Sequence, residues 1–146
     1  MDDAQAQPPA QVVVRESGNG PYGQVVSAGH HVAGADEPER AGGHDTGMSP
    51  YEYLLSALGA CTSMTIRMYA GRHGWPLERV TVALRHVVET GPDGPQDRFD
   101  RQIGLAGALS DEQRQRLLEI AGKCPVSRTL QRASRVVSDL VAEPGA

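Results

Sequence analysis

Two cysteines, Cys61 and Cys124, are the residues of this sequence best suited to chemistry. Cys61 lies among small residues that leave room beside its sulfur: Ser56, Ala57, Gly59, Ala60, Thr62 and Ser63. Cys124 directly precedes Pro125, at the expected N-cap of a short helix, where the helix dipole and free backbone N–H groups favour a thiolate. Two cysteines are too few for a disulfide scaffold or a structural zinc site. They are therefore either two buried fillers, since free cysteine packs as a small hydrophobe, or a redox couple.

A long helix is expected to position Cys61. Ser49 and Glu52 form a Ser-x-x-Glu capping box with Pro50 at the first helical position, and Gly74 is the natural stop. The apolar residues between these ends do not keep to one stripe: Leu54, Leu55, Leu58, Met64, Ile66, Met68 and Tyr69. A helix that is apolar all round is a buried one. A chain of 146 residues has difficulty covering such a helix alone, so we expect a homodimer in which a second copy covers the remaining face.

The segments on either side of this helix show strand and helix patterns. Strands are expected at residues 11–17, 24–32, 78–89, 98–107 and 134–143, and helices at 110–122 and 125–133. Residues 33–49 read as a long polar loop with room for a short third strand. This order of elements is α+β, with antiparallel sheet packed on a buried helix. We expect a disordered tail at residues 1–10 and a single domain at 11–143.

Composition argues against several classes of partner. A net charge of -4 disfavours nucleic-acid binding, which needs a basic stripe. No run of about 18 or more uncharged apolar residues is present, so no membrane span is expected. The first residues are acidic and lack the apolar stretch of a secretory signal, which makes a cytoplasmic location the expectation. His30, His31 and His44 fit no usual zinc spacing, and we expect neither a metal nor an organic cofactor.

The surroundings of the two cysteines resemble those of the OsmC/Ohr family of peroxide-reducing proteins. The motifs are "ALGACTSM" around Cys61 and "KCPV" around Cys124, and the resemblance extends over about residues 11–143. The stretch "DEP…GGHDTGMSPYE" is similar to the broader OsmC-like branch of the family. The resemblance implies an OsmC/Ohr-like fold, an intertwined homodimer with its sites at the subunit interface, and a thiol peroxidase that acts on organic hydroperoxides.

The same resemblance assigns roles to the two thiols. Cys61 matches the peroxidatic cysteine of the family and Cys124 the resolving one. The Cys61 thiolate would attack the O–O bond and become a sulfenic acid. Cys124 would condense with it to a Cys61–Cys124 disulfide, which an external dithiol reductant would then reduce.

A buried thiolate also needs a cation, which the family supplies as an arginine held by a glutamate. Arg40 lies close to the spacing of the OsmC-type arginine, and Arg15 is the reserve candidate, although its strand position suits a solvated face. Glu52 matches the glutamate loosely, because it stands nine residues before Cys61 where the organic-hydroperoxide enzymes have ten. The other interpretation of Glu52 is that it only caps the helix.

Helix geometry limits what Glu52 can reach. Nine residues correspond to about 900° of rotation, which gives roughly opposite faces, and to about 13 Å of rise. Glu52 therefore cannot touch Cys61 of its own chain. If it serves the site, we expect it to reach Cys61 of the partner subunit.

Two other functions stay open beside the peroxidase. The expected pocket walls are apolar (Leu54, Leu58, Met64 and Met68), which favours organic hydroperoxides as substrates. The main alternative is a non-peroxidase OsmC-like protein that binds a small apolar ligand at the dimer interface or senses redox state through slow oxidation of Cys61. The third is a structural dimer with inert buried cysteines, which the presence of both cysteine motifs disfavours.

Overall fold

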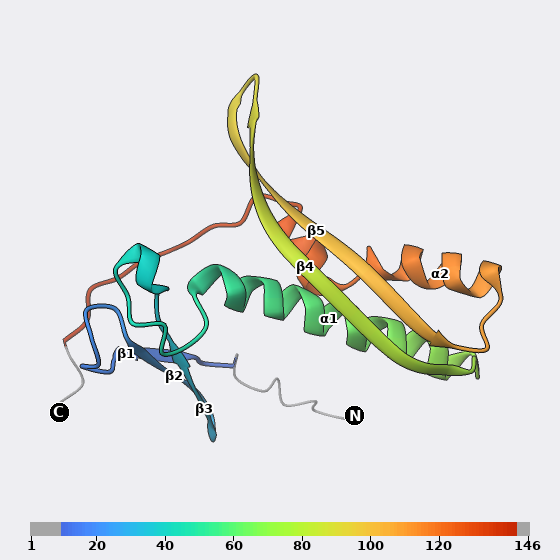
Figure 1. Cartoon of the computed structure of the whole chain (residues 1–146), viewed down its shortest axis with the longest axis horizontal. Helices are drawn as coiled ribbons and strands as arrows, with labels where there is room; N and C mark the ends of the chain where they lie inside the picture. The colour runs from blue at the N-terminus through green and yellow to red at the C-terminus, as the bar shows by residue number, and fades with distance from the viewer. Residues whose placement is uncertain (1–9, 143–146) are drawn as a thin grey trace, which may run out of the picture. The chain divides into compact units, whose positions relative to one another are not determined.

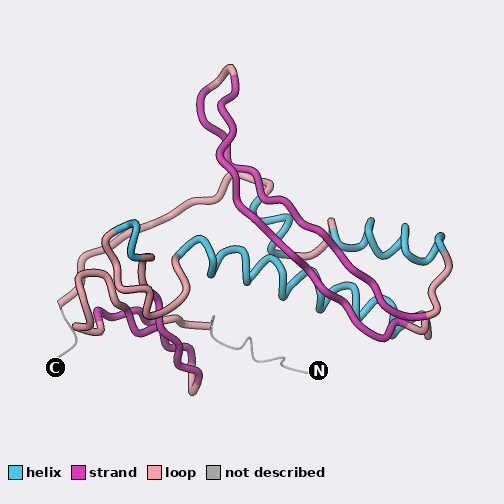
Figure 2. The backbone as a smooth tube through the Cα atoms, viewed as in Figure 1, coloured by secondary structure: helices cyan, strands magenta, loops and turns pink. Residues whose placement is uncertain are grey.

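The computed structural model describes residues 10–142, which form two compact units, one ending at Ser56 and the other beginning at Ala57. The elements are, in chain order, β1 (Val13–Glu16), β2 (Gln24–Ala28), β3 (His31–Ala35), η1 (Glu39–Ala41), α1 (Pro50–Arg72), β4 (Leu77–Gly91), β5 (Gly94–Gly107), α2 (Asp111–Ala121) and α3 (Pro125–Leu130) (Figure 1). In this part of the chain, two antiparallel sheets and three α-helices confirm the α+β class (Figure 2). The single domain at 11–143 stays a prediction, and residues 1–9 of the expected tail lie outside the described residues.

The first unit contains a three-stranded antiparallel sheet in the order β1-β2-β3. The prediction of one strand at residues 24–32 is wrong, because a tight turn at Gly29 and His30 divides that segment into β2 and β3. Gly29 has a φ of 59°, and glycine at the first central position is typical of the type II′ turn that joins twisted strands. The third strand therefore begins two residues before the polar loop in which room for it was expected, and includes residues 33–35 of that loop.

Asp36 organises the loop that follows β3. Its carboxylate is buried and accepts hydrogen bonds from the backbone N–H groups of Glu37, His44 and Thr46, and from the Thr46 hydroxyl at 2.7 Å. These contacts close a loop from which Arg40 projects at the surface, on η1. The polar loop is thus a defined structure held by one carboxylate.

Helix α1 begins and ends as the sequence predicts. The Ser49 N–H donates to Glu52 Oε2 at 2.7 Å and the Glu52 N–H donates to Ser49 Oγ at 3.4 Å, which confirms the capping box. After the last helical residue, Gly74 adopts a φ of 62° and the Trp75 N–H donates to the Ala70 carbonyl, as in a Schellman-type end.

The single chain buries α1 along one stripe only. Leu58, Thr62, Ile66 and Ala70 are spaced by four residues and are buried. Met64 and Met68 are 64% and 55% exposed. Burial on every side, which the apolar pattern predicts, is therefore not reached within one chain.

In the second unit, β4 and β5 form one long twisted hairpin (Figure 1). Side chains from this hairpin pack with α1 and α2 around one core, whose buried members are Ile66, Ala70, Leu77, Leu117 and Ala121. The Ser110–Gln113 capping box at the start of α2 is present as predicted. Gly59 of α1 lies so close to β4 that a Cβ there would stand 2.7 Å from Leu84 Cδ1, which shows how tightly the helix approaches the sheet.

The last predicted strand, at 134–143, is wrong for its described part. Residues 134–142 have no regular secondary structure. They carry exposed apolar side chains: Val136, Val137, Leu140 and Val141. The alternating pattern is suited to a strand, but a strand forms only where a neighbour offers hydrogen bonds, and no pairing with this segment occurs in the described chain.

Candidate thiol site

The two cysteines come together in the second unit. Cys61 lies in the middle of α1 and is half-buried, whereas Cys124 is fully buried. The Cys61 side chain lies near enough to the Cys124 sulfur to lower the pKa of the Cys124 thiol. Residues 63 positions apart in sequence are therefore neighbours in this unit.

Cys124 is the N-cap of α3, as its position before Pro125 predicts. Its sulfur accepts a hydrogen bond from the Ser127 N–H at 3.3 Å. The hydroxyl of Thr62, the next residue after Cys61, lies 3.8 Å from the same sulfur. Cys124 is thus surrounded by polar groups although no part of it reaches solvent.

Arg101 on β5 is the residue of this site that sequence reasoning missed. Its Nη1 donates to Thr62 Oγ1 at 2.9 Å and to the Ala121 carbonyl at 3.0 Å. A signal was available, because strand alternation places Arg101 on the same face as Phe99 and Ile103, where an arginine is out of pattern. An arginine in register with apolar neighbours could have been identified as a partly buried cation.

The environment of Cys124 favours its charged form. Burial raises the pKa of the Cys124 thiol. Hydrogen bonds from the Ser127 N–H, from Cys61 and from Thr62, together with the positive charge of Arg101, lower the same pKa. These effects prevail over burial, so the pKa of Cys124 lies below its ordinary value.

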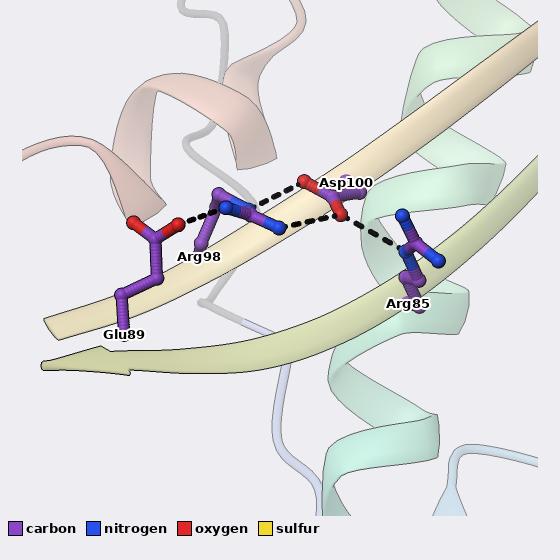
Figure 3. A network of polar contacts seen from close by, with 4 residues as sticks. All are labelled: Arg85, Glu89, Arg98 and Asp100. Atoms are coloured by element: carbon purple, nitrogen blue, oxygen red, sulfur yellow. Dashed lines mark hydrogen bonds and ion pairs between the residues drawn. The ribbon is translucent and has the colours of Figure 1, made fainter.

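The neighbouring carboxylate on β5 does not cancel the charge of Arg101. Asp100 lies on the other face of the strand, where its oxygens accept from Arg98 and from Arg85 Nε (Figure 3). Arg98 also pairs with Glu89 across the hairpin. These hydrogen bonds hold the pKa of Asp100 below its usual range. Arg101 meanwhile donates to two neutral oxygens, and its positive charge favours the Cys124 thiolate.

The expected charge partners lie in the first unit. Glu52 serves the capping box, and the hydrogen bonds from the backbone N–H and hydroxyl of Ser49, with the charge of Arg40, hold its pKa below its ordinary value. Arg40 and Glu52 are thus electrostatic neighbours. Arg15 lies on β1 opposite Val25 and is exposed. The roles of these three residues at the thiol site stay predictions.

A cavity of about 460 Å³ lies beside residues that surround Cys124, although neither cysteine is part of its lining. Its lining residues are Leu58, Gln96, Asp97, Arg98, Phe99, Arg101, Ser127, Leu130 and Gln131. Leu58, Arg101 and Ser127 belong both to this lining and to the hydrogen-bonded surroundings of Thr62 and Cys124. Of the expected apolar walls, Leu58 is in place, while Met64 and Met68 are largely exposed.

Two kinds of site are not found in residues 10–142. No cluster of three or more His, Cys, Asp or Glu side chains is arranged to hold a metal ion there. Among the helices of the same residues, none has the length and apolarity required to cross a bilayer.

The family model for OsmC-like proteins matches residues 43–139, a range that includes Glu52, both cysteines and Arg101. The chain belongs to the OsmC-like family. Arg15 and Arg40 precede the range that matches the OsmC-like model. No curated protein sequence is significantly similar to this OsmC-like chain.

Solved structures show the same OsmC-like fold at low sequence identity. The organic hydroperoxide resistance protein OsmC of Legionella pneumophila is 19% identical, with a TM-score of 0.67 over 87% of this chain and 92% of that one. An OsmC-like protein of Mycoplasma pneumoniae is 18% identical, with a TM-score of 0.71 over 86% and 89%. The organic hydroperoxide resistance protein OhrB of Bacillus subtilis is 18% identical, with a TM-score of 0.63 over 86% and 93%. This likeness establishes the fold of the chain.

Proposed function

We propose that this OsmC-like protein is a thiol-dependent peroxidase that reduces organic hydroperoxides to alcohols. The observation that carries the proposal is the proximity of two thiols, one half-buried and the other held in surroundings that favour a thiolate. Support also comes from the names of structural relatives, which are organic hydroperoxide resistance proteins.

The proposed reaction has two steps before recycling. The Cys61 thiolate attacks one peroxide oxygen, the O–O bond breaks, and the alkoxide leaves as an alcohol after taking a proton. Cys61 is then a sulfenic acid. The Cys124 thiolate attacks the Cys61 sulfur, hydroxide leaves as water after protonation, and a Cys61–Cys124 disulfide forms. An external dithiol returns the disulfide to two thiols.

The proposed charges come from two arginines. Arg40, held by Glu52, is the candidate cation that stabilises the attacking Cys61 thiolate and the departing alkoxide. Arg15 is the reserve for that role. Arg101 serves the Cys124 side of the pair through its hydrogen bond to Thr62.

The preference for organic peroxides is proposed from the cavity that shares Leu58, Arg101 and Ser127 with the surroundings of Thr62 and Cys124. Leu58, Phe99 and Leu130 give it apolar wall, which an alkyl or aryl group can contact and hydrogen peroxide cannot exploit. Arg98 and Arg101 at the same cavity give it a polar side.

A homodimer belongs to the same proposal. The apolar surface of Met64 and Met68 on α1, and of Val136 and Leu140 in the C-terminal segment, is large for a chain of this size and suits a second copy. A cytoplasmic location also belongs to it, because dithiol reductants are maintained in reducing compartments.

The test is stopped-flow consumption of cumene hydroperoxide and of hydrogen peroxide with a dithiol reductant. We expect the wild type to consume the organic peroxide faster, and Cys61→Ser to lose turnover because a hydroxyl supplies no thiolate at neutral pH. Cys124→Ser should complete one reduction and then stop, with a sulfenic acid on Cys61 that dimedone traps. Retention of more than a few per cent of the wild-type rate in Cys61→Ser contradicts the assignment.

The second candidate is a binding or redox-sensing protein without peroxidase turnover. The cavity lined by Leu58, Arg101 and Ser127 and the use of Glu52 in a helix cap favour it. It predicts that an apolar ligand protects Cys61 from alkylation while peroxide is consumed no faster than by free cysteine. Measuring both rates on the same sample separates the two candidates.

A further inference from the structure

The reductive half of the cycle requires a choice between two sulfurs. A thiolate that reduces the Cys61–Cys124 disulfide must attack one of them and expel the other. We propose that the external dithiol attacks Cys61 Sγ, and that Thr62 and Arg101 hold Cys124 as the departing thiolate. This inference rests on the disulfide of the proposed function.

Access to solvent distinguishes the two sulfurs. Cys124 has no exposed surface within its own chain, so the addition of a second copy cannot uncover it. In the single chain, Cys61 is half-buried and keeps part of its surface open. Thiol–disulfide exchange depends on which sulfur the attacking thiolate can approach. The approach therefore leads to Cys61.

The groups around Cys124 suit a leaving thiolate. The Ser127 N–H lies 3.3 Å from the sulfur and the Thr62 hydroxyl oxygen 3.8 Å from it. Arg101 donates a hydrogen bond to the Thr62 hydroxyl oxygen at 2.9 Å. A thiol that is stabilised as its thiolate leaves faster in exchange. Access and leaving-group stability therefore favour the same direction of attack.

The Thr62 hydroxyl can change its acceptor by a single rotation when the charge on the Cys124 sulfur changes. Its hydroxyl has a single hydrogen and two acceptors within reach, the Leu58 carbonyl at 2.7 Å and the Cys124 sulfur. When Cys124 is a thiol, that hydrogen is directed to the carbonyl. When Cys124 leaves with a negative charge, rotation about the Cβ–Oγ1 bond of Thr62 turns the hydroxyl hydrogen toward the sulfur. Arg101 keeps donating to the Thr62 oxygen in both states.

The step balances without any further reactant. The dithiol's thiolate forms a bond to Cys61 Sγ while the Cys61–Cys124 bond breaks, and Cys124 leaves with the electron pair. The second thiol of the dithiol, after losing its proton, attacks the first sulfur of the reductant. Cys61 is released and takes up a proton, and the dithiol becomes a disulfide. Two electrons pass from the dithiol to the cysteine pair.

The first experiment locates the attack. The protein is oxidised with diamide, which makes a disulfide without peroxide, and is then exposed briefly to glutathione. Acid quenching, alkylation with N-ethylmaleimide and peptide mass spectrometry identify which cysteine carries glutathione. We expect glutathione on Cys61 and N-ethylmaleimide on Cys124. Glutathione on Cys124 overturns the proposal.

The second experiment tests the positioning residue. Arg101→Met should slow reduction of the diamide-made disulfide by dithiothreitol roughly tenfold or more, because the Cys124 thiolate loses a nearby positive charge and Thr62 loses its charged donor. Arg101→Lys should recover part of that rate. In the Cys61→Ser background, thiolate absorbance near 240 nm should show a higher Cys124 pKa in Arg101→Met than in the parent. An unchanged rate and an unchanged pKa overturn the role of Arg101.

Three further variants keep the test decisive. Arg85→Met removes an arginine from the opposite face of the hairpin and should leave the reduction rate unchanged. If circular dichroism shows that Arg101→Met does not fold, Thr62→Val and Thr62→Ser replace it, with slower reduction expected only for the valine variant.

The reductive step is measured without peroxide, so absence of peroxidase turnover overturns the proposed function alone. Attack at Cys124 overturns this inference alone.

Discussion

At the scale of single residues, Asp36 links acidity to the structure of the loop that carries Arg40. The hydrogen bond from the Thr46 hydroxyl, with those from the backbone N–H groups of Thr46, Glu37 and His44, holds the pKa of Asp36 below its ordinary value of 3.8. A carboxyl group with a depressed folded pKa stabilises the fold above its unfolded pKa and loses that contribution as the pH falls through the folded value. The loop should therefore loosen below about pH 4.

Asp36→Asn tests this linkage. The amide keeps one acceptor but does not ionise, so the variant should be less stable than the wild type near pH 7. The difference in stability between the two proteins should narrow as the pH is lowered from about 5 to about 3, because only the wild type then loses the negative charge of Asp36. Thermal denaturation at several pH values measures it. Asp45→Asn, an exposed position in the same loop, is the control and should follow the wild-type curve.

Arg101 shows what residue patterns could and could not predict of the site. Cys61 and Cys124 were identifiable from their flanking residues, and the N-cap position of Cys124 followed from Pro125. The contact between Thr62 and Arg101 is formed by segments 39 residues apart. Local patterns describe neighbours in sequence, so a pairing that depends on how a helix meets a strand was not accessible to them.

At the scale of elements, the start of α1 combines a cap and a charge in Glu52. The two contributions can be separated, because glutamine also closes a Ser-x-x-Glu/Gln capping box. The free energy of unfolding of Glu52→Gln should lie within about 0.5 kcal/mol of the wild-type value. If the pairing with Arg40 activates the thiol, the same variant should reduce cumene hydroperoxide about tenfold more slowly. Chemical denaturation and stopped-flow kinetics on one preparation give both quantities.

The controls for this prediction are two arginine variants. Arg40→Ala should slow peroxide reduction further, by roughly 10²–10³-fold, because it removes the cation itself. Arg15→Ala should leave the rate unchanged. Normal rates in Glu52→Gln and Arg40→Ala, with a slow Arg15→Ala, would transfer the role to Arg15.

Helix α2 offers a matched pair of leucines. Leu117 is fully buried in the core, and its neighbour Leu118 is 53% exposed. Leu117→Ala should lower the free energy of unfolding by about 2–5 kcal/mol, because it removes buried methyl groups and leaves a cavity. Leu118→Ala should cost less than about 1 kcal/mol. Urea denaturation compares them, and equal losses would contradict the orientation of α2.

Element boundaries were predictable where side chains cap the backbone. Both capping boxes, at Ser49 and Ser110, are present where the sequence places them. The turn at Gly29 was missed because its two residues interrupt a run that alternates well enough to read as one strand. The strand at 134–143 was wrong in its described part because alternation indicates a tendency, while a strand also requires a partner edge.

At the scale of the whole molecule, the exposed apolar side chains predict association. The purified protein should scatter light as a particle of about twice the 15.6 kDa of one chain at micromolar concentration. Met68→Lys should shift the mass toward the single chain, because it places a charge in the apolar surface of α1. Gln115→Lys, which adds the same charge at an exposed polar position on α2, should not. A wild type that scatters as a single chain would refute the dimer and the trans role of Glu52.

The proximity of the two thiols also determines how strongly the protein resists overoxidation when peroxide is in excess. A Cys61 sulfenic acid can be captured by Cys124 beside it or meet a second peroxide molecule and advance to a sulfinic acid, from which ordinary thiols cannot restore it. Capture is intramolecular, and well-oriented neighbours react with effective concentrations of about 10⁵ M or more, far above any dissolved peroxide. Excess oxidant should therefore convert the protein to the Cys61–Cys124 disulfide, which a dithiol can still reduce. Irreversible oxidation of Cys61 should be confined to chains that lack the Cys124 thiol.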